Sequence, residues 1–469
     1  MNPTIRRTKI VATLGPATAR AEQVGALLDA GANVLRVNAS HGTPQLRAQW
    51  IETARQQADQ RELPIAVLVD LQGPRIRVGE LKQPRLLEPG QTVVLAPEDG
   101  ATGDQLPTTY DSLAHDTRVG ARILLNDGLL ALEVTRVTPP RVEARVLIGG
   151  ELTSHKGMNL PGLAVSAPAL TAKDREDVAA AVEQHADYLA LSFVRRAEDL
   201  ETLRALVPKT MKLVAKIEKS AALDDLERIL TTTDAVMVAR GDLGVELPFE
   251  TVPLVQKRLI REANRHGKPV ITATQMLESM VHNPRPTRAE ASDVANAILD
   301  GTDAVMLSAE TAVGEYPVEA VKAMDRIIRE MERQLPGTAD RRRVEPRQGV
   351  AVEDAIAMGT TAVARMLDTP LIVSLTQGGF TARKVAAFRP PVPILAVTTA
   401  PLTYRQLALV WGTVPVLVDR VPGYDAMLEV VRDQIVKRGF AKPGDRIVMT
   451  AGVPWEVSGS TNLIKVEEV

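Results

Sequence analysis

The stretch KLVAKIEKSAALDDLERILTTTDAVMVARGD, residues 212–242, sets the fold class of this chain. Two short apolar runs within it each lead into ionisable residues: Lys216 and Glu218 after the first, and Arg240 and Asp242 after the second. A strand, an intervening helical stretch and a second strand form a βαβ unit, whose strands run parallel. We therefore expect both pairs of ionisable side chains at the same edge of one parallel sheet.

The same pattern recurs along the chain. Amphipathic stretches separate most of the apolar runs, and 251–266 places Val252, Val255, Leu259 and Ala263 on one helical face. Eight strands alternating with helices predict an α/β fold of the (β/α)₈ barrel type. The expected strands are Ile10–Leu14, Asn33–Val37, Ile65–Val69, Tyr188–Leu191, Lys212–Ala215, Ala235–Ala239, Pro269–Ala273 and Ala304–Leu307.

One connection is far longer than the others. About a hundred residues, with Pro/Gly turns and short β-rich pieces, separate Asp70 from the helical pattern at 173–185. They predict a small β domain inserted at the catalytic face of the barrel, where it can act as a lid. After the barrel, helices and strands alternate again and predict an open α/β domain. Its expected helices are 352–367, 381–388 and 424–438, and its expected strands are 371–375, 394–397 and 446–450. The predicted domains are the barrel at 1–70 and 168–338, the lid at 71–167, and the C-terminal domain at 339–469.

Composition narrows the functional class. The net charge of −2 gives no basic surface for nucleic acid or an anionic membrane, and there are no cysteines for disulfides, zinc or thiol catalysis. The N-terminus MNPTIRRTKI lacks the apolar core of a signal peptide, and no run has the ~18 apolar residues of a membrane span. We expect a soluble cytoplasmic protein that binds neither nucleic acid nor membrane.

Chemistry in such a barrel lies at the carboxyl ends of the strands. Two carboxylates on neighbouring strands are typical ligands of Mg²⁺ or Mn²⁺, and a lysine beside them adds a compact positive charge. Together these groups can stabilise a transferring phosphoryl group or an enolate. Solvated loop charges are the alternative, but ionisable groups at five of eight strand ends favour a site. The polar residues at these ends are Arg36, Asn38, Ser40, His41, Asp70, Lys216, Glu218, Arg240, Asp242, Thr272, Thr274, Ser308 and Glu310.

These strand ends resemble those of pyruvate kinases, and the likeness covers essentially the whole chain. The blocks MVARGDLGVE (237–246) and TATQMLESM (272–280) are the most specific. The resemblance implies the barrel, a small β-barrel lid, a C-terminal regulatory domain and a homotetramer. It also implies phosphoryl transfer from phosphoenolpyruvate to ADP, giving pyruvate and ATP. Further matching blocks are RRTKIVATLGPAT (6–18), GANVLRVNASHG (31–42), LLNDGLL (124–130), KGMNLPG (156–162), KIE (216–218), NPRPTRAEASDVANAILDG (283–301) and LSAETAVGEYP (307–317).

The resemblance also implies residue roles. Lys216 matches the residue that stabilises the transferring phosphoryl group, and Glu218 and Asp242 match the ligands of the divalent metal. The segment Arg240-Gly241-Asp242 and Thr274 match the grip on the substrate carboxylate, and Thr274 also lies on the route that protonates the enolate. The implied catalytic set is completed by Arg36, which meets phosphate, and Asp127, which faces the site from the lid.

The implied nucleotide contacts come from the barrel and the lid. Asn38, Ser40 and His41 match positions near the nucleotide, although His41 is equally compatible with a solvent-facing loop. Arg77 and Lys156 match phosphate contacts from the lid, and for Lys156 the alternative is a solvated surface lysine.

One stretch of the sequence differs from the corresponding stretch of the K⁺-dependent pyruvate kinases. The K⁺ site of those enzymes is formed by the equivalents of Asn38, Ser40, Asp70 and Leu71. Their stretch reads Asp-Thr-Lys-Gly-Pro-Glu-Ile-Arg-Thr, whereas this chain has Leu71, Gln72, Arg75 and Val78 at the four differing positions. A fixed cation near Asp70 would replace the charge of K⁺ and repel a second cation. We expect that K⁺ is not required; the rival interpretation is a solvent-facing Arg75 beside a surviving K⁺ site.

The turn SLTQGGFTA (374–382) follows a predicted strand and opens a helix. The resemblance places an allosteric site here, with Thr376, Gln377, Gly379 and Thr381 as candidate ligands for AMP or a sugar phosphate. An ordinary αβ turn is the alternative, and Gly378 replaces a hydroxyl residue common in this loop.

Two other functions compete with the kinase interpretation. A metal-dependent aldolase or lyase would need Glu218 and Asp242 but not Asp127 and Lys156. A non-catalytic sugar-phosphate sensor would be expected to have lost Lys216, Glu218 or Thr274, and all three are present.

Overall fold

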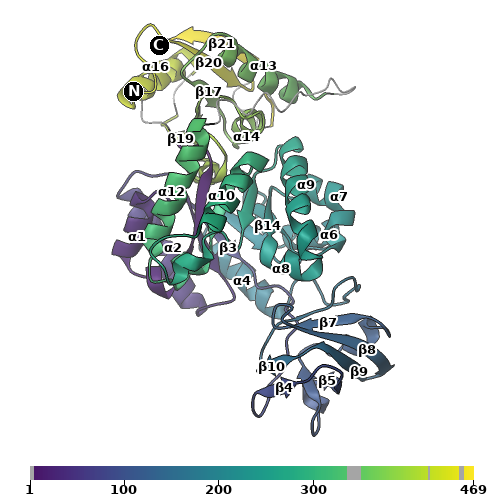
Figure 1. Ribbon diagram of the computed structural model, residues 1–469. Helices are drawn as coiled ribbons and strands as arrows, with labels where there is room; N and C mark the ends of the chain where they lie inside the picture. Colours follow the sequence, from purple (N-terminus) through teal and green to yellow (C-terminus); the bar gives the residue numbers. More distant parts are fainter. Residues whose placement is uncertain (1–4, 335–349, 421–422, 454–458) are drawn as a thin grey trace.

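The computed structural model describes residues 5–334, 350–420, 423–453 and 459–469 of the 469-residue chain. Three bodies are stacked along the molecule (Figure 1). The closed barrel forms the middle, the inserted lid lies at one end of it, and the C-terminal domain lies at the other end. The expected boundary at 338/339 falls outside the described residues.

The barrel closes from eight parallel strands, as predicted. Its order around the ring is β1-β16-β15-β14-β13-β12-β3-β2, so the first and last strands pair with each other. Each strand begins and ends within two residues of its expected bounds, and the largest difference is at β13, which ends at Ile217 instead of Ala215. The strands are β1 Lys9–Leu14, β2 Val34–Asn38, β3 Ala66–Asp70, β12 Tyr188–Leu191, β13 Lys212–Ile217, β14 Ala235–Ala239, β15 Val270–Ala273 and β16 Ala304–Leu307.

Helices cover the outside of the barrel. α9 has the expected apolar face, with Leu259 and Ala263 buried. Several helices begin with a threonine cap, such as Thr171, whose hydroxyl accepts from the Asp174 amide. The helices are α1 Ala21–Asp29, α2 Pro44–Asp59, α4 Ala172–Glu183, α5 Ala197–Arg204, α6 Ala221–Asp224, α7 Leu226–Thr232, α8 Arg240–Glu246, α9 Val252–Arg265, α10 Arg288–Asp300, α11 Ala309–Ala312 and α12 Pro317–Gln334.

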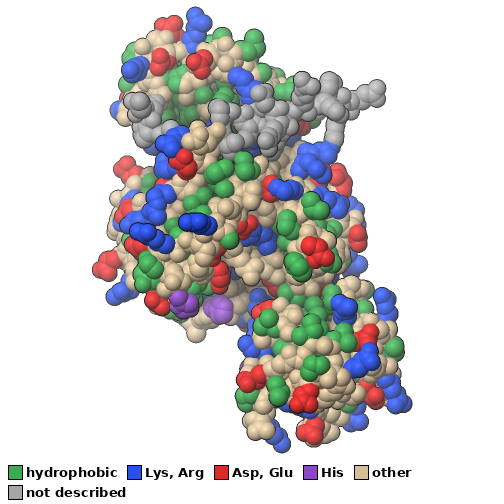
Figure 2. Space-filling model, viewed as in Figure 1, with side chains coloured by type: hydrophobic (Ala, Val, Ile, Leu, Met, Phe, Trp, Pro, Cys, Tyr) green, Lys and Arg blue, Asp and Glu red, His purple; other side chains and the backbone are tan. Residues whose placement is uncertain are grey.

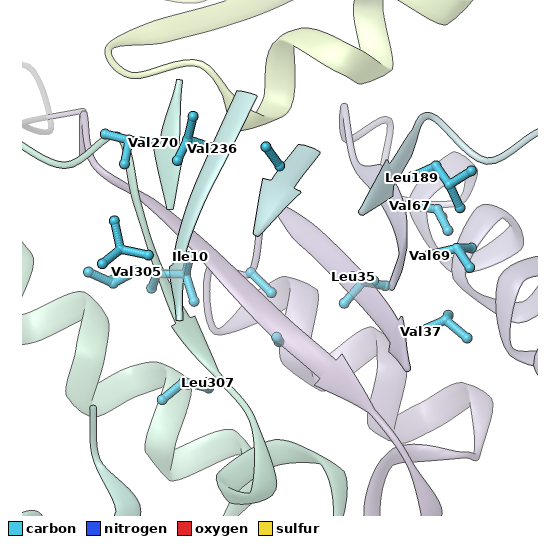
Figure 3. Packing of buried hydrophobic residues seen from close by; sticks show 14 of the residues in the cluster. Ile10, Leu35, Val37, Val67, Val69, Leu189, Val236, Val270, Val305 and Leu307 are labelled. Carbon is cyan, nitrogen blue, oxygen red and sulfur yellow. The ribbon is translucent and has the colours of Figure 1, made fainter. Parts of the chain in front are cut away.

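Side chains alternate between the two faces of each barrel strand, so the barrel has two separate hydrophobic cores. Ile10, Leu35 and Val69 belong to the large cluster between strands and helices, part of which Figure 3 shows. Val11 and Val34, one residue away along their strands, belong to the cluster inside the barrel. Successive side chains of a strand point to opposite faces, so the inward face also carries the polar residues at the strand ends.

The lid lies between β3 and α4. Its six-stranded sheet has the order β11-β7-β8-β9-β5-β6, and β4 pairs with β10. Arg77 pairs with Gly157 beside one edge of the sheet, and Val78 pairs with Thr108 at the other edge. The hinge segment therefore joins both edges and closes a small β barrel. The elements are β4 Arg85–Leu87, β5 Thr92–Pro97, β6 Leu106–Thr108, α3 Leu113–Asp116, β7 Arg122–Leu125, β8 Leu130–Thr138, β9 Arg141–Ile148, β10 Gly150–Leu152 and β11 Met158–Asn159.

The C-terminal domain is a five-stranded sheet of order β19-β18-β17-β20-β21, in which β21 alone is antiparallel. α15, β19 and β21 were not among the expected elements, because their short or charged sequences lack a clear period. The elements are α13 Val352–Met366, β17 Ile372–Leu375, α14 Phe380–Ala387, β18 Ile394–Thr398, α15 Pro401–Gln406, β19 Thr413–Leu417, α16 Gly423–Lys437, β20 Arg446–Ala451 and β21 Leu463–Glu468.

The C-terminal domain packs against the amino-terminal end of the barrel. Ala408 and Leu409 join the cluster inside the barrel. The Tyr188 hydroxyl donates to the Gln406 carbonyl at 2.6 Å, and Lys9 Nζ donates to the Thr413 carbonyl at 2.7 Å. These buried contacts tie the domain to the barrel at the end opposite the polar strand ends.

Candidate active site

A buried ion network fills the carboxyl end of the barrel. Asp70 is 1% exposed and accepts from Arg36, with Nη2 at 2.7 Å and Nε at 2.8 Å from Oδ2. Its other oxygen, Oδ1, lies 3.1 Å from Lys216 Nζ. Lys216 Nζ also lies 2.9 Å from Glu218 Oε1. Four residues predicted at three different strand ends thus form one chain of alternating charge.

The network fixes the protonation state of its members. Burial alone would lower the pKa of Lys216, but the charges of Asp70 and Glu218 outweigh burial and raise it. Burial alone would raise the pKa of Asp70, but Lys216 and Arg36 bring it below its usual value. Lys216 is therefore a permanent cation at neutral pH, and Asp70 is a permanent anion.

Two members of this network were missed in the sequence. Ser192, directly after β12, accepts from Lys216 Nζ at 2.7 Å and donates to the Leu71 carbonyl at 2.7 Å. Thr13, near the end of β1, accepts from Arg36 Nη1 at 3.1 Å. Both residues lie at strand ends, and this position could have marked them as candidate site residues. A single hydroxyl residue at a strand end does not by itself indicate a site.

Glu218 and Asp242 are the paired carboxylates expected to hold a metal. Burial raises the pKa of Glu218, and the nearby negative charge of Asp242 raises it further against the opposing effect of Lys216. Within the described ranges, no group of three or more His, Asp or Glu side chains is arranged around a metal position. A two-carboxylate pair fits Mg²⁺, which keeps several waters and takes further oxygen ligands from a phosphorylated substrate.

Thr274 is held in an unusual backbone conformation. Its φ of 68° is in the left-handed region, which is strained for a β-branched residue by about 1–3 kcal/mol. Its hydroxyl accepts from the Gly241 amide at 2.8 Å, and its carbonyl accepts from Arg240 Nη2 at 2.7 Å. Arg240 is anchored in turn by Asp293, with Nη1 2.7 Å from Oδ2. Asp293, on α10, is a further residue that sequence reasoning missed.

A cavity of about 250 Å³ separates the lid from the barrel. Figure 2 shows the corresponding hollow between the two bodies. The lid turn at Asn126–Gly128 reaches the barrel, because a Cβ on Gly128 would lie 3.8 Å from Val245 of α8. The expected site residues brought together on the cavity wall are Arg75, Arg77, Asp127, Lys156 and Asp242.

The cations of this cavity differ in their partners. Arg77 Nη1 donates to the His155 carbonyl at 3.3 Å. Arg75 and Lys156 form no side-chain hydrogen bond or ion pair with any residue that the structure describes. The expectation that Arg75 lies beside Asp70 is wrong: Arg75 is exposed, and the ion-pair partners of Asp70 are Arg36 and Lys216. Two unpaired cations in one cavity favour an anionic ligand.

The loop after β2 lies beside these arginines. Asn38 pairs in register with Asp70, and its Oδ1 accepts from the Ser40 amide at 3.0 Å. His41 is exposed; partial burial first, and then the charges of Arg75, Arg36 and Arg77, lower its pKa. A neutral imidazole at the rim can contact a nucleotide without adding charge.

The expected effector turn lies in the C-terminal domain. Thr376 and Thr381 are buried, and the Thr381 hydroxyl lies 2.8 Å from that of Thr461. Gln377 Oε1 accepts from Thr399 at 3.1 Å. Gly379, with φ at 74°, directly precedes α14, where a side chain would be strained. Ser374 and Thr450, adjacent in register, carry buried hydroxyls without a partner in the described chain.

No helix in the described ranges is long and apolar enough to span a bilayer.

Comparisons with known proteins agree with this architecture. Residues 5–321 match the family described as pyruvate kinase, barrel domain, and residues 354–467 match pyruvate kinase, alpha/beta domain. The chain is 46% identical to pyruvate kinase 2 of Synechocystis, over 100% of this chain and 80% of that protein. It is 44% identical to the pyruvate kinase of Agrobacterium vitis, over 99% of this chain and 97% of the relative.

A solved structure gives the same result in three dimensions. The pyruvate kinase of Cryptosporidium parvum superposes with a TM-score of 0.94 at 33% identity, covering 99% of this chain and 96% of that one. These likenesses extend over the lid and the C-terminal domain as well as the barrel, which a barrel aldolase or lyase would not share. The chain therefore belongs to the pyruvate kinase family, the phosphotransferases that act between phosphoenolpyruvate and ADP.

Proposed function

We propose that the ion network at the carboxyl end of the barrel carries out phosphoryl transfer from phosphoenolpyruvate to ADP, with Lys216 as its central group. The observation that carries this proposal is the buried Lys216 ammonium between Asp70 and Glu218. Its raised pKa excludes it as a base at neutral pH. It is suited to stabilise the negative charge of a phosphoryl group in flight, which is an electrostatic role.

Arg36 binds the phosphoryl group in this proposal. Asp70 engages its Nε and Nη2, and Thr13 engages Nη1, so the planar fork has a fixed orientation. A preoriented guanidinium loses less conformational freedom when it binds phosphate oxygens. Asp70 is therefore a positioning residue that acts through Arg36 and Lys216.

Glu218 and Asp242 would hold Mg²⁺ or Mn²⁺. The bound metal would supply positive charge opposite the developing enolate oxygen. The backbone of Arg240-Gly241-Asp242 and the Thr274 hydroxyl bind the substrate carboxylate, and the Arg240 side chain holds the Thr274 carbonyl. The Thr274 hydroxyl is then placed on the route by which the enolate is protonated to pyruvate.

The nucleotide occupies the cavity between lid and barrel. Arg77 and Lys156 meet its phosphates, since both line the cavity and Lys156 has no partner in the described chain. Asp127 faces the same cavity from a lid turn. Asn38, Ser40 and His41 contact the nucleotide from the rim of the barrel.

The enzyme works without K⁺. Asp70 already has two fixed cations, Arg36 and Lys216, at 2.7 Å and 3.1 Å. Arg75 adds a third positive charge near the Asn38–His41 loop, since it lowers the pKa of His41 after the effect of burial. An added monovalent cation at Asn38, Ser40, Asp70 and the Leu71 carbonyl would meet this charge, and Leu71 O is already occupied by Ser192.

The C-terminal domain binds a phosphorylated effector, AMP or a sugar phosphate, at the turn of Thr376, Gln377, Gly379 and Thr381. The buried, unpartnered hydroxyls of Ser374 and Thr450 support a polar ligand site here. The active form is a cytoplasmic homotetramer in this proposal, supported by the family resemblance. Light scattering of the purified chain tests the assembly.

A coupled assay with phosphoenolpyruvate and ADP tests the central role of Lys216. We expect Lys216→Met to lower kcat by at least about 1000-fold, the scale on which removal of a preorganised electrostatic group acts. Lys9→Met is the matched control: Lys9 is also a buried lysine of the barrel, 5% exposed, but it lies at the opposite end beside Thr413. Wild-type turnover in Lys216→Met would overturn the assignment.

A further inference from the structure

A second cavity, of about 100 Å³, lies between the barrel and the C-terminal domain. The barrel contributes Asp234, Lys268 and the His266–Gly267 turn, and α14 contributes Arg383 and Lys384. The stem of Lys384 packs on the barrel, because a Cβ on Gly267 would lie 3.8 Å from its Cδ. This cavity is remote from the catalytic network, since it lies where β14 and β15 begin.

The charges around this cavity do not balance. Its wall carries three cations, Lys268, Arg383 and Lys384, and one carboxylate, Asp234. Asp234 is already paired with two other cations, Arg204 and Lys212, the latter at 3.1 Å.

Lys384 has its own carboxylate, Asp354, at 2.7 Å from its Nζ. Lys268 donates to the Thr233 carbonyl at 2.6 Å and forms no ion pair with the residues that the structure describes. Two positive charges of the wall, those of Lys268 and Arg383, thus lack an acidic partner in the described parts of the chain.

Arg383 is the strongest single indication of a ligand. Its side chain is half-buried and lines the cavity. A guanidinium has five N–H donors. Among the described residues, its side chain has one hydrogen bond, from Nη1 to the Gly378 carbonyl at 3.1 Å. Burial lowers the pKa of Arg383, against the opposing charges of Tyr188 and Asp234. Burial, and then the charges of Arg383, Lys212 and Lys384, lower the pKa of Lys268 against the opposing charge of Asp234, so Arg383 disfavours the charged form of Lys268.

We propose that this cavity is an anion site that binds one phosphoryl group between Lys268, Arg383 and Lys384. The arginine fork and two ammonium groups match the geometry and charge of phosphate oxygens. The small volume holds a single phosphoryl group, free or at the end of a phosphomonoester whose remainder lies outside the cavity. The site is separate from the expected effector ligands Thr376 and Thr381, which face the interior of the C-terminal domain.

The position of the site links two parts of the molecule. Arg383 holds the carbonyl of Gly378, which belongs to the effector turn. Lys268 lies two residues before β15, and Thr274 directly follows the far end of that strand. Asp234 directly precedes β14, and Asp242 lies in α8, which directly follows β14. An anion bound by Arg383 and Lys268 therefore cross-links the effector turn to the two strands that carry substrate-binding residues.

Isothermal titration calorimetry of the full chain with inorganic phosphate tests the proposal. We expect Lys268→Gln and Arg383→Gln each to weaken one phosphate-binding event at least tenfold. Lys257→Gln is the matched control, because Lys257 pairs with Asp300 on the barrel surface and does not line the cavity. Thr381→Ala controls for binding at the effector turn. Lys257→Gln should bind phosphate as the wild type does, and Thr381→Ala should keep this binding event whether or not it loses a separate event at the effector turn.

Each outcome either supports or overturns the proposed site. The site is overturned if Lys268→Gln and Arg383→Gln match the wild type in titrations with both inorganic phosphate and glycerol phosphate, or if Thr381→Ala loses the same binding event. If Arg383→Gln fails to fold, Lys268→Gln decides, with Arg383→Lys expected to keep binding. Repeating the titration with glycerol phosphate distinguishes a free phosphate ligand from a phosphomonoester. Binding of phosphate marks a free-anion site, and binding of glycerol phosphate alone marks a phosphomonoester site. Lys268→Gln should retain turnover, so this result is independent of the catalytic assignment.

Discussion

Lys216 Nζ lies 3.1 Å from Asp70 Oδ1 at the carboxyl end of the barrel, although the two residues lie on strands that are not neighbours. Because β12 separates them in the sheet, the contact depends on both side chains pointing into the barrel. Asp70 thus holds Lys216, the proposed catalytic lysine, and, through its second oxygen, Arg36.

Replacing Asp70 should be costly. Asp70→Asn leaves Arg36 and Lys216 buried without the Asp70 carboxylate that they share. Breaking a buried ion pair costs about 3–5 kcal/mol. We expect the free energy of unfolding to fall by that amount in denaturant titrations at pH 7. The variant should also lose activity, because Arg36 and Lys216 lose their orientation. A stability equal to the wild type would show that the network is not strongly coupled to Asp70.

The same residue predicts a pH dependence. The pKa of Asp70 is lowered in the folded protein, so its stabilising contribution is present above its unfolded value of about 3.9 and is lost as the pH falls through the folded value. The difference in unfolding free energy between wild type and Asp70→Asn should therefore shrink as the pH is lowered below about 4. A difference that stays constant with pH would contradict the assigned shift.

Asp293 should affect turnover without touching substrate. It anchors Arg240, which holds the Thr274 carbonyl in its strained position. We expect Asp293→Asn to lower kcat by about 10- to 100-fold with little change in the KM for phosphoenolpyruvate, because a small misplacement of a catalytic group has this effect. Asp300→Asn, on the same helix but paired with Lys257, should leave kcat unchanged. An equal effect of both variants would indicate general destabilisation of α10.

Arg75 should decide the response to K⁺. The wild type should keep full activity when K⁺ is replaced by tetramethylammonium. The variant Leu71→Thr, Gln72→Lys, Arg75→Glu, Val78→Thr should lose at least about tenfold in kcat without K⁺ and regain it when K⁺ is added, since its fixed charge is gone. Arg122→Glu, an exposed lid arginine, is the control. Collapse of wild-type activity without K⁺ would refute the idea.

Lys9 should make the protein more stable at high pH. Burial and the charge of Arg6 lower the pKa of Lys9 to about 7, against the opposing charges of Glu332 and Asp303. Between pH 7 and about 10.4 the unfolded chain then binds a proton that the folded chain does not, so stability rises with pH. The thermal midpoint of Lys9→Met should lack this rise. Equal pH profiles for the two proteins would contradict the shift.

The order of strands and helices could be predicted from the sequence because apolar period and turn residues are local properties. The bounds of the barrel strands were predicted to within two residues. β21 and α15 were missed because a charged edge strand and a helix of six residues carry little periodic signal. Side chains two residues apart on a strand point to the same face. Arg36, Asp70 and Lys216 therefore share the inward face, since each follows an inward-facing apolar residue by two positions.

The tertiary structure decided which of these side chains meet. Strand stagger and closure of the ring bring Asp70 to Arg36 and Lys216, whereas Arg75, which is close to Asp70 in sequence, lies in the lid cavity. Ser192 and Asp293 join the site only through contacts between distant segments. The uncompensated cations Lys268 and Arg383 come from different domains, so no local pattern could reveal them. The sequence by itself determined the type and facing of each residue, because backbone geometry is local; the electrostatic partners were decided by the packing of the closed barrel against its two flanking domains.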